Sequence, residues 1–294
     1  MTTSNWFTTG TFILDGGWGT QLQLRGLGMG EHPDLWNLSR PEKVQEVAEA
    51  YIQAGSDIIL TNTFGSNRFL LTKHGAEDKI AELNRAGVRI SKEAARKQNR
   101  RVFASIGPTG VMLMSGTVTP DELYAAFLEQ AGAIAAEVPD GIVVETMSDP
   151  AEAVLAVKAA KTTGLPVAAS MVFDTGKNKD RTMMGTTPEQ AVEQLTAAGA
   201  DIVGSNCGQG IDGFIPICRR IRAVTTLPIW MKANAGLPEI VDGKTVYHQT
   251  PEKFAVSAKE LWAAGANFLG GCCGTTPEYI RALRNVSPVS KENH

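Results

Sequence analysis

A strand followed by a helix recurs along the whole chain, and this repeat constrains the fold more than any other feature of the sequence. Short apolar runs typical of buried strands are preceded three times by Ala-Gly-x-Asp or Ala-Gly-x-Asn, at residues 54–57, 198–201 and 264–267. Helical segments follow the runs, and several begin with Thr-Pro or Asp-Pro, where the missing N–H of proline costs no hydrogen bond. Eight such units predict a closed barrel of parallel strands.

The repeat defines where each element is expected. Strands are predicted at residues 11–15, 57–61, 101–106, 141–145, 166–170, 201–205, 228–232 and 267–270. Helices are predicted to start near residues 39, 77, 119, 149, 187, 214, 250 and 276, the first with the capping-box spacing of Ser39 and Glu42. The glycine-containing segment 22–38 is expected to be a loop.

We therefore expect an α/β chain folded as a single-domain (β/α)8 TIM barrel over residues 1–294, with its core at about 11–286. The structural alternative is an open, doubly wound sheet. No Gly-x-Gly-x-x-Gly fingerprint follows the first strand, and this disfavours the open sheet.

Composition limits the classes of partner. The chain has 294 residues with 43% hydrophobic side chains and a net charge of −3, so a large core is available and attraction to nucleic acid or acidic membranes is not expected. Residues 1–5 lack the basic start of a secretory signal, and no run approaches the ~20 apolar residues of a membrane span. Four cysteines, two of them adjacent, do not form a secreted disulfide pattern, so we expect a cytoplasmic protein; a homo-oligomer is compatible with these features.

Three cysteines follow the ends of two predicted strands. Cys207 comes after the sixth strand, and Cys272 and Cys273 come after the eighth. Because strand ends of a parallel barrel meet at one mouth, the three thiolates are expected to bind zinc and to leave its fourth position open. The alternative is that they are buried structural thiols, the interpretation that we apply to Cys218.

Polar groups at other strand ends point to an amino-acid substrate. Asp15 and Glu145 end apolar strands, where a carboxylate is costly without a partner, so they are expected to bind a cation such as a substrate ammonium. The alternative is that they anchor loops. Asn234 is expected at a turn or at the open zinc position. Lys232 raises a rival hypothesis, a lyase that forms a Schiff base.

The chain has few histidines, and this shortage limits the chemistry. His32, His74, His248 and His294 all lie away from the predicted strand ends, which disfavours a serine–histidine hydrolase and a histidine-ligated metal. Zinc stabilises a bound thiol as thiolate without a general base. The reaction that fits is attack of this sulfur on a methyl group carried by N⁺, S⁺ or cobalt.

Five motifs together resemble the homocysteine S-methyltransferase family, and the resemblance runs from about residue 12 to 283. They are DGGWGT at residues 15–20, TNTFG at 61–65, VETM at 144–147, NCG at 206–208 and GGCCGT at 270–275. Residues 34–38, 54–65 and 182–186 are most similar to the homocysteine domain of cobalamin-dependent methionine synthases and to stand-alone bacterial enzymes that use glycine betaine.

The resemblance implies a function and a set of site residues. It implies zinc-dependent methylation of homocysteine to methionine, with zinc on Cys207, Cys272 and Cys273 and with Asn234 able to occupy the metal before substrate arrives. The implied substrate-binding groups are Asp15 and Glu145 for the amino group, backbone amides near Gly16 and Ser205 for the carboxylate, and Thr61 and Asn62 at the second strand end.

The methyl donor implied by the resemblance is glycine betaine, with dimethylglycine as the other product. A quaternary ammonium needs an aromatic cage, for which Trp18, Trp36, Phe64 and Tyr247 are the candidates. Animal betaine enzymes carry tyrosines where this chain has Thr146 and Gly65, so its cage must differ. Alternative donors are a methylated corrinoid protein and S-methylmethionine. Outside this class, the Lys232 lyase and a non-catalytic zinc-binding barrel are the remaining hypotheses.

Overall fold

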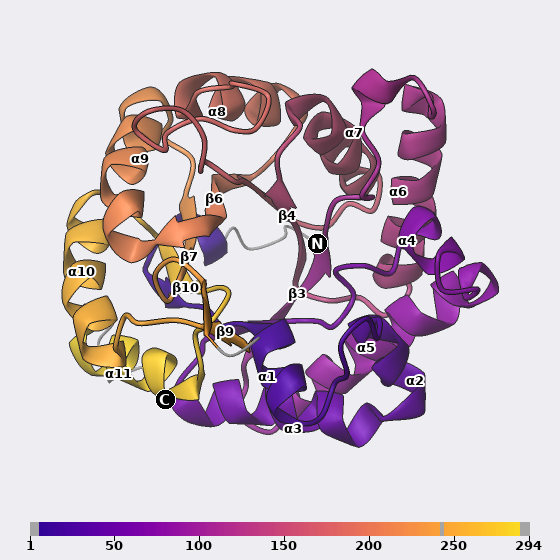
Figure 1. Cartoon of the computed structure of the whole chain (residues 1–294), viewed down its shortest axis with the longest axis horizontal. Coiled ribbons are helices and arrows are strands. Elements are labelled where there is room, and N and C mark those ends of the chain that lie inside the picture. The colour runs from indigo at the N-terminus through magenta and orange to yellow at the C-terminus, as the bar shows by residue number, and fades with distance from the viewer. Residues whose placement is uncertain (1–5, 242–243, 289–294) are drawn as a thin grey trace.

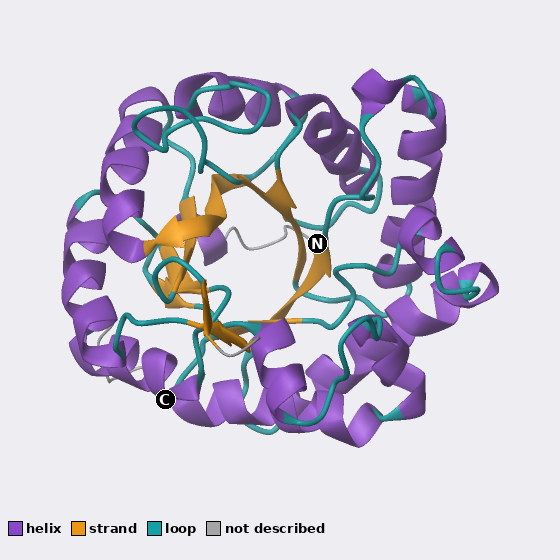
Figure 2. Ribbon diagram, in the orientation of Figure 1, coloured by secondary structure: helices purple, strands orange, loops and turns teal. Residues whose placement is uncertain are grey.

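The chain folds as a (β/α)8 barrel, as the repeat predicts. A computed structural model describes residues 6–241 and 244–288. Seen along the barrel axis, the strands form an inner ring and the helices form an outer ring around it (Figures 1 and 2). Apolar strands are therefore covered on both sides, inside by side chains that fill the barrel and outside by the helices.

Eight strands run parallel in the order β1-β10-β7-β6-β5-β4-β3-β2. Their bounds are β1 Phe12–Ile13, β2 Ile58–Leu60, β3 Arg101–Ile106, β4 Gly141–Met147, β5 Val167–Met171, β6 Ile202–Gly210, β7 Ile229–Asn234 and β10 Phe268–Gly271. All eight overlap the predicted strands. A short antiparallel hairpin of β8 Glu239–Val241 and β9 Lys244–Val246, which the repeat does not predict, is inserted after β7.

The helices alternate with these strands. The α-helices are α1 Trp18–Leu24, α2 Trp36–Ser39, α3 Pro41–Ala54, α4 Arg68–Thr72, α5 Ile80–Arg96, α6 Pro120–Ala135, α7 Pro150–Lys161, α8 Pro188–Ala197, α9 Ile211–Val224, α10 Pro251–Ala263 and α11 Pro277–Val286. Short 3-10 helices are η1 Trp6–Thr8, η2 Pro33–Leu35, η3 Glu77–Lys79 and η4 Leu113–Ser115.

The predicted helix starts are confirmed where proline marks them. α6 begins at Pro120 with a full capping box, in which the Thr119 side chain accepts from the amide of Glu122. The capping box predicted at Ser39 is wrong. Arg40 precedes α3, and the Ser39 hydroxyl donates to the Leu35 carbonyl because Ser39 belongs to the end of α2.

The segment 22–38 was expected to be a loop, and this expectation is wrong in part. α1, η2 and α2 occupy much of it. The glycines that suggested a loop are confined to the connection between α1 and η2. Trp36 begins α2 and is fully buried, with its indole N–H donating to Glu31 Oε1 at 2.8 Å.

The edges of β1 and β2 are joined by side chains as much as by backbone. The Asp57 amide donates to the Ile13 carbonyl at 2.7 Å, and the Ile13 amide donates to Asp57 Oδ2 at 2.8 Å. The other oxygen of Asp57 pairs with Arg100 and with Arg284 of α11. Asp57 therefore fastens the first strand, the second strand and the last helix together.

The lower half of the barrel interior is aromatic. Trp230 of β7 stacks between Phe103 and Phe268, with ring centroids 5.5 Å and 5.4 Å away. Below them, Trp6 of η1 makes edge contacts with Phe103 and Phe12. Burial of these large rings closes the barrel at this end, so a ligand cavity can form only at the other end.

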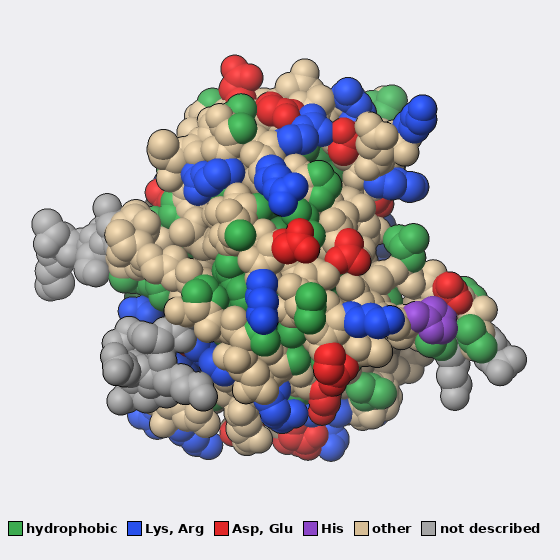
Figure 3. Space-filling model, turned by 90° about the vertical axis from the view of Figure 1, so that its left-hand side faces the viewer, with side chains coloured by type: hydrophobic (Ala, Val, Ile, Leu, Met, Phe, Trp, Pro, Cys, Tyr) green, Lys and Arg blue, Asp and Glu red, His purple; other side chains and the backbone are tan. Residues whose placement is uncertain are grey.

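The outer surface is mixed in charge. The face formed by α9 and α10 intersperses basic and acidic side chains with small hydrophobic areas (Figure 3). Among the described residues, no helix combines the length and the apolar character needed to cross a bilayer.

Candidate active site

A cavity of about 430 Å³ opens at the carboxyl ends of the strands, where active sites of such barrels lie. Its walls come from the segments after β1, β2 and β10 and from residues within β3, β4, β6 and β7 near their carboxyl ends. The predicted site residues that line it are Gly16, Trp18, Thr61, Asn62, Phe64, Glu145, Cys207, Cys272 and Cys273. Lys232, His32, Asp34, Leu70, Ser105 and Thr146 line it as well.

The three predicted cysteines meet in this cavity. The sulfur atoms of Cys207, Cys272 and Cys273 lie within 4.8 Å of one another, and those of Cys207 and Cys273 are 3.9 Å apart. Tetrahedral zinc with Zn–S bonds of about 2.3 Å places its sulfurs about 3.8 Å apart. The separation of Cys207 and Cys273 matches this value, and the three thiols together could hold a metal ion of this size.

Unusual backbone angles present these sulfurs to the cavity. Cys207 has φ +62°, a left-handed conformation that a residue with a side chain rarely adopts, and it lies where the register between β6 and β7 changes, between Asn206 and Gly210. Gly274, with φ +78°, turns the chain after the two adjacent cysteines, and a Cβ there would collide with the Tyr247 ring. Strain of this kind is typical of functional sites.

Asn206 holds the neighbouring loop in place. It is fully buried, and its Oδ1 accepts from the Thr146 amide at 2.7 Å and from the Ser170 hydroxyl at 2.6 Å. Its Nδ2 donates to the Thr146 hydroxyl at 2.7 Å. Thr146 also has φ +62°. A buried amide thus fastens the strained residue after Glu145 to the strand that carries Cys207.

Without a metal, the three cysteines favour a state in which one is a thiolate and the other two are protonated thiols. Hydrogen bonds from Cys272 and Cys273 lower the pKa of Cys207 to about 3. The hydrogen bond to Cys207 raises the pKa of Cys272 and raises that of Cys273 to about 12. Charging all three sulfurs therefore requires a cation among them.

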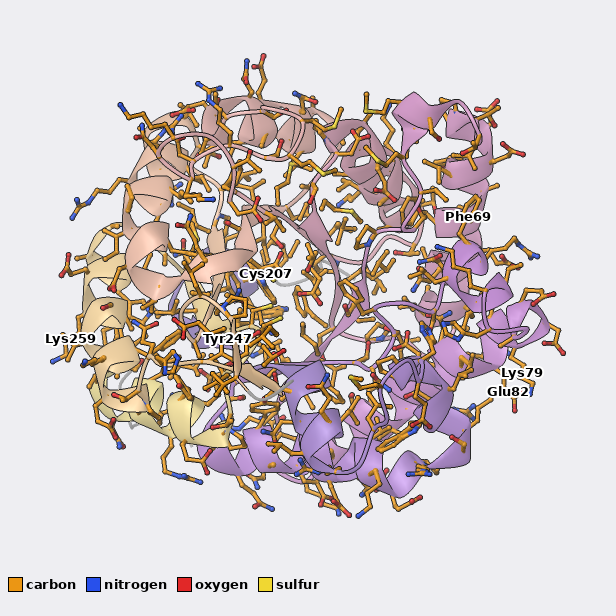
Figure 4. The ribbon with its side chains drawn as sticks, viewed as in Figure 1. Phe69, Lys79, Glu82, Cys207, Tyr247 and Lys259 are labelled. Atoms are coloured by element: carbon orange, nitrogen blue, oxygen red, sulfur yellow. The ribbon has the colours of Figure 1, made fainter. Side chains whose placement is uncertain are left out.

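Asn234 and Tyr247 flank the sulfurs but do not line the cavity. Asn234 Oδ1 accepts from the Cys273 amide at 3.1 Å. Burial, and then the charges of Cys273 and Cys207, raise the pKa of Tyr247. Figure 4 shows Tyr247 and Cys207 together near the barrel axis, far from the peripheral Lys259.

Asp15, Lys232 and Glu145 form a buried row of charges below the sulfurs. Lys232 Nζ pairs with Asp15 Oδ1, while Asp15 Oδ2 accepts from the Trp18 indole and the Leu60 amide, both at 2.6 Å. Glu145 Oε1 accepts from the Ser105 hydroxyl at 2.6 Å. Burial raises the pKa of Glu145, although Lys232 and Ser105 oppose the shift.

Thr61 and Asn62 are tied into the protein although they border the cavity. Thr61 Oγ1 lies 2.6 Å from Thr63 Oγ1 and accepts from the Ser105 amide. Asn62 Nδ2 donates to the Pro33 carbonyl and to Asn37 Oδ1. Both residues thus shape the wall.

Three other predicted residues, Asp15, Ser205 and Trp36, do not line the cavity. Trp36 was expected among the aromatic residues of the mouth, and the structure corrects this. It packs in the core between strands and helices because it belongs to α2, and Arg40 lies 4.8 Å from its ring centroid. Ser205 is fully buried in β6, between the inward-facing Gly204 and Asn206, so only its backbone is near the site.

Several residues of the site are absent from the sequence-based prediction, and strand alternation could have found some of them. Asn206 lies two residues after the inward-facing Gly204 on β6, and Ser105 lies two residues after the inward-facing Phe103 on β3, so both face the interior. His32 and Asp34 reach the cavity from the start of η2 and from η2 itself; Asp34 belongs to a segment that carries the family resemblance, whereas no sequence signal marked His32. Asp34 Oδ2 accepts from the Gly65 amide and the Ser66 hydroxyl, and burial raises its pKa to about 7.

Cys218 lies apart from the cluster, as predicted. It is fully buried in α9, where its sulfur contacts the carbonyl of Ala264, and burial raises its pKa to about 12. A neutral buried thiol of this kind is inert.

Comparison with known proteins places this site in context. A family model described as homocysteine S-methyltransferase matches residues 12–287. Over 287 residues the chain is 29% identical to the methionine synthase of Mycobacterium tuberculosis, an alignment that covers 92% of this chain and 24% of that protein. The chain thus spans about a quarter of the length of this curated relative.

Solved structures share the fold. The metallated form of the homocysteine methyltransferase MmuM from Escherichia coli superimposes with a TM-score of 0.78 at 22% identity, covering 95% of this chain and 97% of that one. Its apo form gives a TM-score of 0.75 at 20% identity, with 97% and 99% covered. At this level of identity, the two structures support the barrel fold alone.

Proposed function

The chain belongs to the homocysteine S-methyltransferase family, and on that premise we propose that it methylates the sulfur of homocysteine to give methionine, with zinc held by Cys207, Cys272 and Cys273. When bound, zinc would stabilise the substrate thiol as a nucleophilic thiolate at neutral pH. The observation that carries the proposal is the convergence of the three sulfurs in a cavity lined by Glu145.

The residues of this chain perform the remaining tasks. Asn206 and Gly274 hold the loops that present the sulfurs. Asn234 accepts from the Cys273 amide, and it would be the residue able to contact the metal before the substrate arrives. Glu145 lines the cavity as a carboxylate acceptor for the substrate ammonium. The apolar walls exclude water from the thiolate, which keeps it nucleophilic.

We favour glycine betaine as the methyl donor. Trp18 and Phe64 line the cavity and offer aromatic surface to a quaternary ammonium. In the transfer, the thiolate electron pair forms the new S–C bond while the C–N bond of betaine breaks, and its electrons stay on nitrogen as dimethylglycine. The transfer itself moves no proton. The substrate thiol gives up its proton when it binds, and the amine of dimethylglycine takes one up from water, so the transfer needs no histidine base at the sulfurs.

A second possible donor is a methyl group carried on a corrinoid protein. The observation that supports this donor is a set of exposed methionines at the mouth of the barrel. The exposed methionines of the described chain all lie in connections that follow the carboxyl ends of strands, after β1, β3 and β5, namely Met29, Met112, Met114, Met183 and Met184. Flexible methionines are common on surfaces that bind other proteins. A small sulfonium such as S-methylmethionine would leave this rim unused.

Lys232 does not support the rival Schiff-base lyase. Burial alone would lower its pKa, but Asp15 and Glu145 outweigh burial and raise it. An ammonium held in this way has no free electron pair for attack on a carbonyl group.

The test is a donor panel assayed with zinc-loaded protein and homocysteine. We expect methionine and dimethylglycine in equal amounts from betaine, and methionine from a methylated corrinoid if that donor is the true one. Cys273→Ala should lose zinc and lower activity at least about 1,000-fold, because one of the three metal ligands is gone. Cys218→Ala, which removes a thiol outside the cavity, is the matched control.

Two outcomes would contradict the proposal. Full activity in metal-free Cys273→Ala would show that the reaction does not need zinc on these cysteines. Stoichiometric zinc with no methionine from any donor would favour a non-catalytic zinc-binding barrel.

A further inference from the structure

Tyr247 lies against the turn that carries Cys272 and Cys273. It follows β9, where the inserted hairpin rejoins the barrel, and it packs against the hydrophobic core while remaining partly exposed. A Cβ built on Gly274 would lie 2.3 Å from Cγ of the Tyr247 ring. The ring therefore rests on bare backbone, and it can approach the cysteine turn this closely only because residue 274 is a glycine.

The hydroxyl of Tyr247 is hydrogen-bonded to the sulfur of Cys273. A phenol keeps its proton at neutral pH, so it is the donor when the sulfur is a thiolate. Tyr247 is not among the residues that line the cavity. It is therefore placed to act on a sulfur of the protein, and not on a ligand in the cavity.

The other two sulfurs receive hydrogen bonds from different parts of the chain. Cys272 Sγ accepts from Asn206 Nδ2 at 3.9 Å. Cys207 is hydrogen-bonded by the Gly208 amide and by the Asn234 side chain. Removal of the Tyr247 hydroxyl would leave these donors in place, so Cys207 and Cys272 serve as internal references for its effect on Cys273.

A second phenol fastens the segment around Tyr247 from a distance. Tyr279 of α11 donates to the Gln249 carbonyl, and the Gln249 amide donates to the Ala235 carbonyl at 3.2 Å. The Ala235 amide donates in turn to the Cys273 carbonyl at 3.0 Å. Loss of the Tyr279 hydroxyl would thus loosen the same segment and keep the hydrogen bond between Tyr247 and the sulfur.

The position of Cys273 creates a chemical problem that this hydrogen bond can solve. Cys273 lines the cavity that a methyl donor must enter, and a thiolate is a nucleophile in its own right. Attack by Cys273 would form an S–CH₃ bond on the protein as the bond between the methyl group and the donor breaks, which would turn a metal ligand into a neutral thioether. A hydrogen bond stabilises the electron pair of a thiolate, and a thiolate of lower proton affinity is a weaker nucleophile.

We propose that Tyr247 is a positioning residue whose hydrogen bond lowers the reactivity of the Cys273 thiolate, so that the methyl group goes to the substrate sulfur and not to the protein. This inference rests on the proposed function, since it requires thiolates on a metal and a methyl donor in the cavity. It goes beyond that function because it assigns the choice between two sulfur acceptors to a residue outside the cavity wall.

The test measures the alkylation of each cysteine by iodoacetamide in the zinc-loaded full chain, without homocysteine or methyl donor. The sulfur forms an S–C bond, iodide leaves, and peptide fragmentation in a mass spectrometer assigns the product to one cysteine. Tyr247→Phe keeps the ring on Gly274 and removes only the hydroxyl. It should accelerate alkylation of Cys273 about 3- to 10-fold, because roughly half of a change in proton affinity is expressed in the reactivity of a thiolate.

The two other cysteines and a matched variant provide the controls. In Tyr247→Phe the alkylation rates of Cys207 and Cys272 should change less than about 2-fold, since their own hydrogen bonds remain. Tyr279→Phe should leave the rate at Cys273 within about 2-fold of wild type, because the sulfur keeps its donor. Zinc analysis should give the same metal content for all three proteins.

The outcomes separate this inference from the proposed function. Equal acceleration at all three cysteines, or the same acceleration at Cys273 in Tyr279→Phe, would show that Tyr247 only closes the structure and would overturn the proposal. An unchanged rate at Cys273 in zinc-loaded Tyr247→Phe would overturn it too, as would loss of zinc from that variant, which would make the hydroxyl part of metal binding. Each of these results leaves the methylation of homocysteine standing. If wild type holds no zinc, the proposed function falls, and this inference falls with it.

Discussion

The two ends of the barrel interior are built from the same strands but from opposite chemistry. On β7, Trp230 packs in the closed end and Lys232 lines the cavity. On β3, Phe103 and Ser105 show the same change within two residues. Alternate residues of a strand share a face. Two residues further along the same strand, the interior therefore changes from a layer of stacked aromatic rings to a layer of charged and polar side chains.

The difference shows how this barrel separates stability from function. At the closed end, apolar rings are removed from water, which is the main favourable contribution to folding. At the mouth, the chain buries Lys232, Asp15 and Asn206 and keeps Cys207 and Thr146 in left-handed conformations. Such groups cost stability and are retained where chemistry needs them.

The largest expected effect on stability is at the closed end. Trp230→Ala should lower the free energy of unfolding by about 3–5 kcal/mol, because it empties the space between two stacked rings. The folded protein should still bind zinc with unchanged stoichiometry, as measured by denaturation and metal analysis. Trp230→Phe, which also removes an indole N–H without a recorded partner, should cost less than about 1.5 kcal/mol.

The separation of stability at the closed end from function at the mouth would be contradicted if Trp230→Ala lost zinc while its free energy of unfolding hardly changed. The two ends would then be coupled, and the closed end would belong to the site.

An intermediate effect is expected at Asn206. Asn206→Ala removes four hydrogen bonds, one of them to Cys272 Sγ, and leaves the Thr146 amide and the Ser170 hydroxyl without this partner, which should cost about 1–3 kcal/mol. Its kcat/KM should fall further than that of Trp230→Ala at a temperature where both are folded. Thr146→Gly is the control: relief of its φ of +62° should offset the lost hydroxyl contact, so stability should hardly change.

Equal activity losses in Asn206→Ala and Trp230→Ala would show that the mouth needs only a folded barrel. The polar network would then have no specific role in presenting the sulfurs.

The smallest effect is expected at Asp34, in the wall of the mouth. Burial raises its pKa in the folded state to about 7, above its value of 3.8 when exposed. The folded state therefore binds more protons, and the contribution of Asp34 to stability is present at low pH and is lost as pH rises through about 7. Asp34→Asn should show a smaller decline in the free energy of unfolding between pH 5 and pH 8.

Parallel pH profiles for wild type and Asp34→Asn would contradict this assignment. His32 Nε2 lies 3.9 Å from Asp34 Oδ2, and burial lowers the pKa of His32, so His32→Gln is the appropriate control for a contribution of this neighbouring group.

Much of the fold was predictable because its signals are local. Apolar runs located all eight barrel strands, and proline after threonine or aspartate located five helix starts, such as Pro120 and Pro188. The helices within 22–38 were missed because nearby glycines suggested a loop. The β8–β9 hairpin was missed because it is an insertion that the strand–helix repeat does not contain.

The site was predictable to the extent that it follows strand ends. Cys207, Cys272 and Cys273 meet as expected because the carboxyl ends of parallel strands share one mouth. The pairing of Lys232 with Asp15 was not predictable, since it joins residues 217 positions apart and depends on which side chains meet across the interior. Trp36 was misplaced because a tryptophan in a presumed loop was taken to be accessible.

Asp57 has a consequence for how the chain is made. The residue that fastens β1 to β2 pairs also with Arg284, which lies 227 positions later. During synthesis, this clasp cannot form until the final helix has left the ribosome. Until then, Asp57 can join the first two strands only through its hydrogen bonds with Ile13, and the nascent barrel lacks the support of α11.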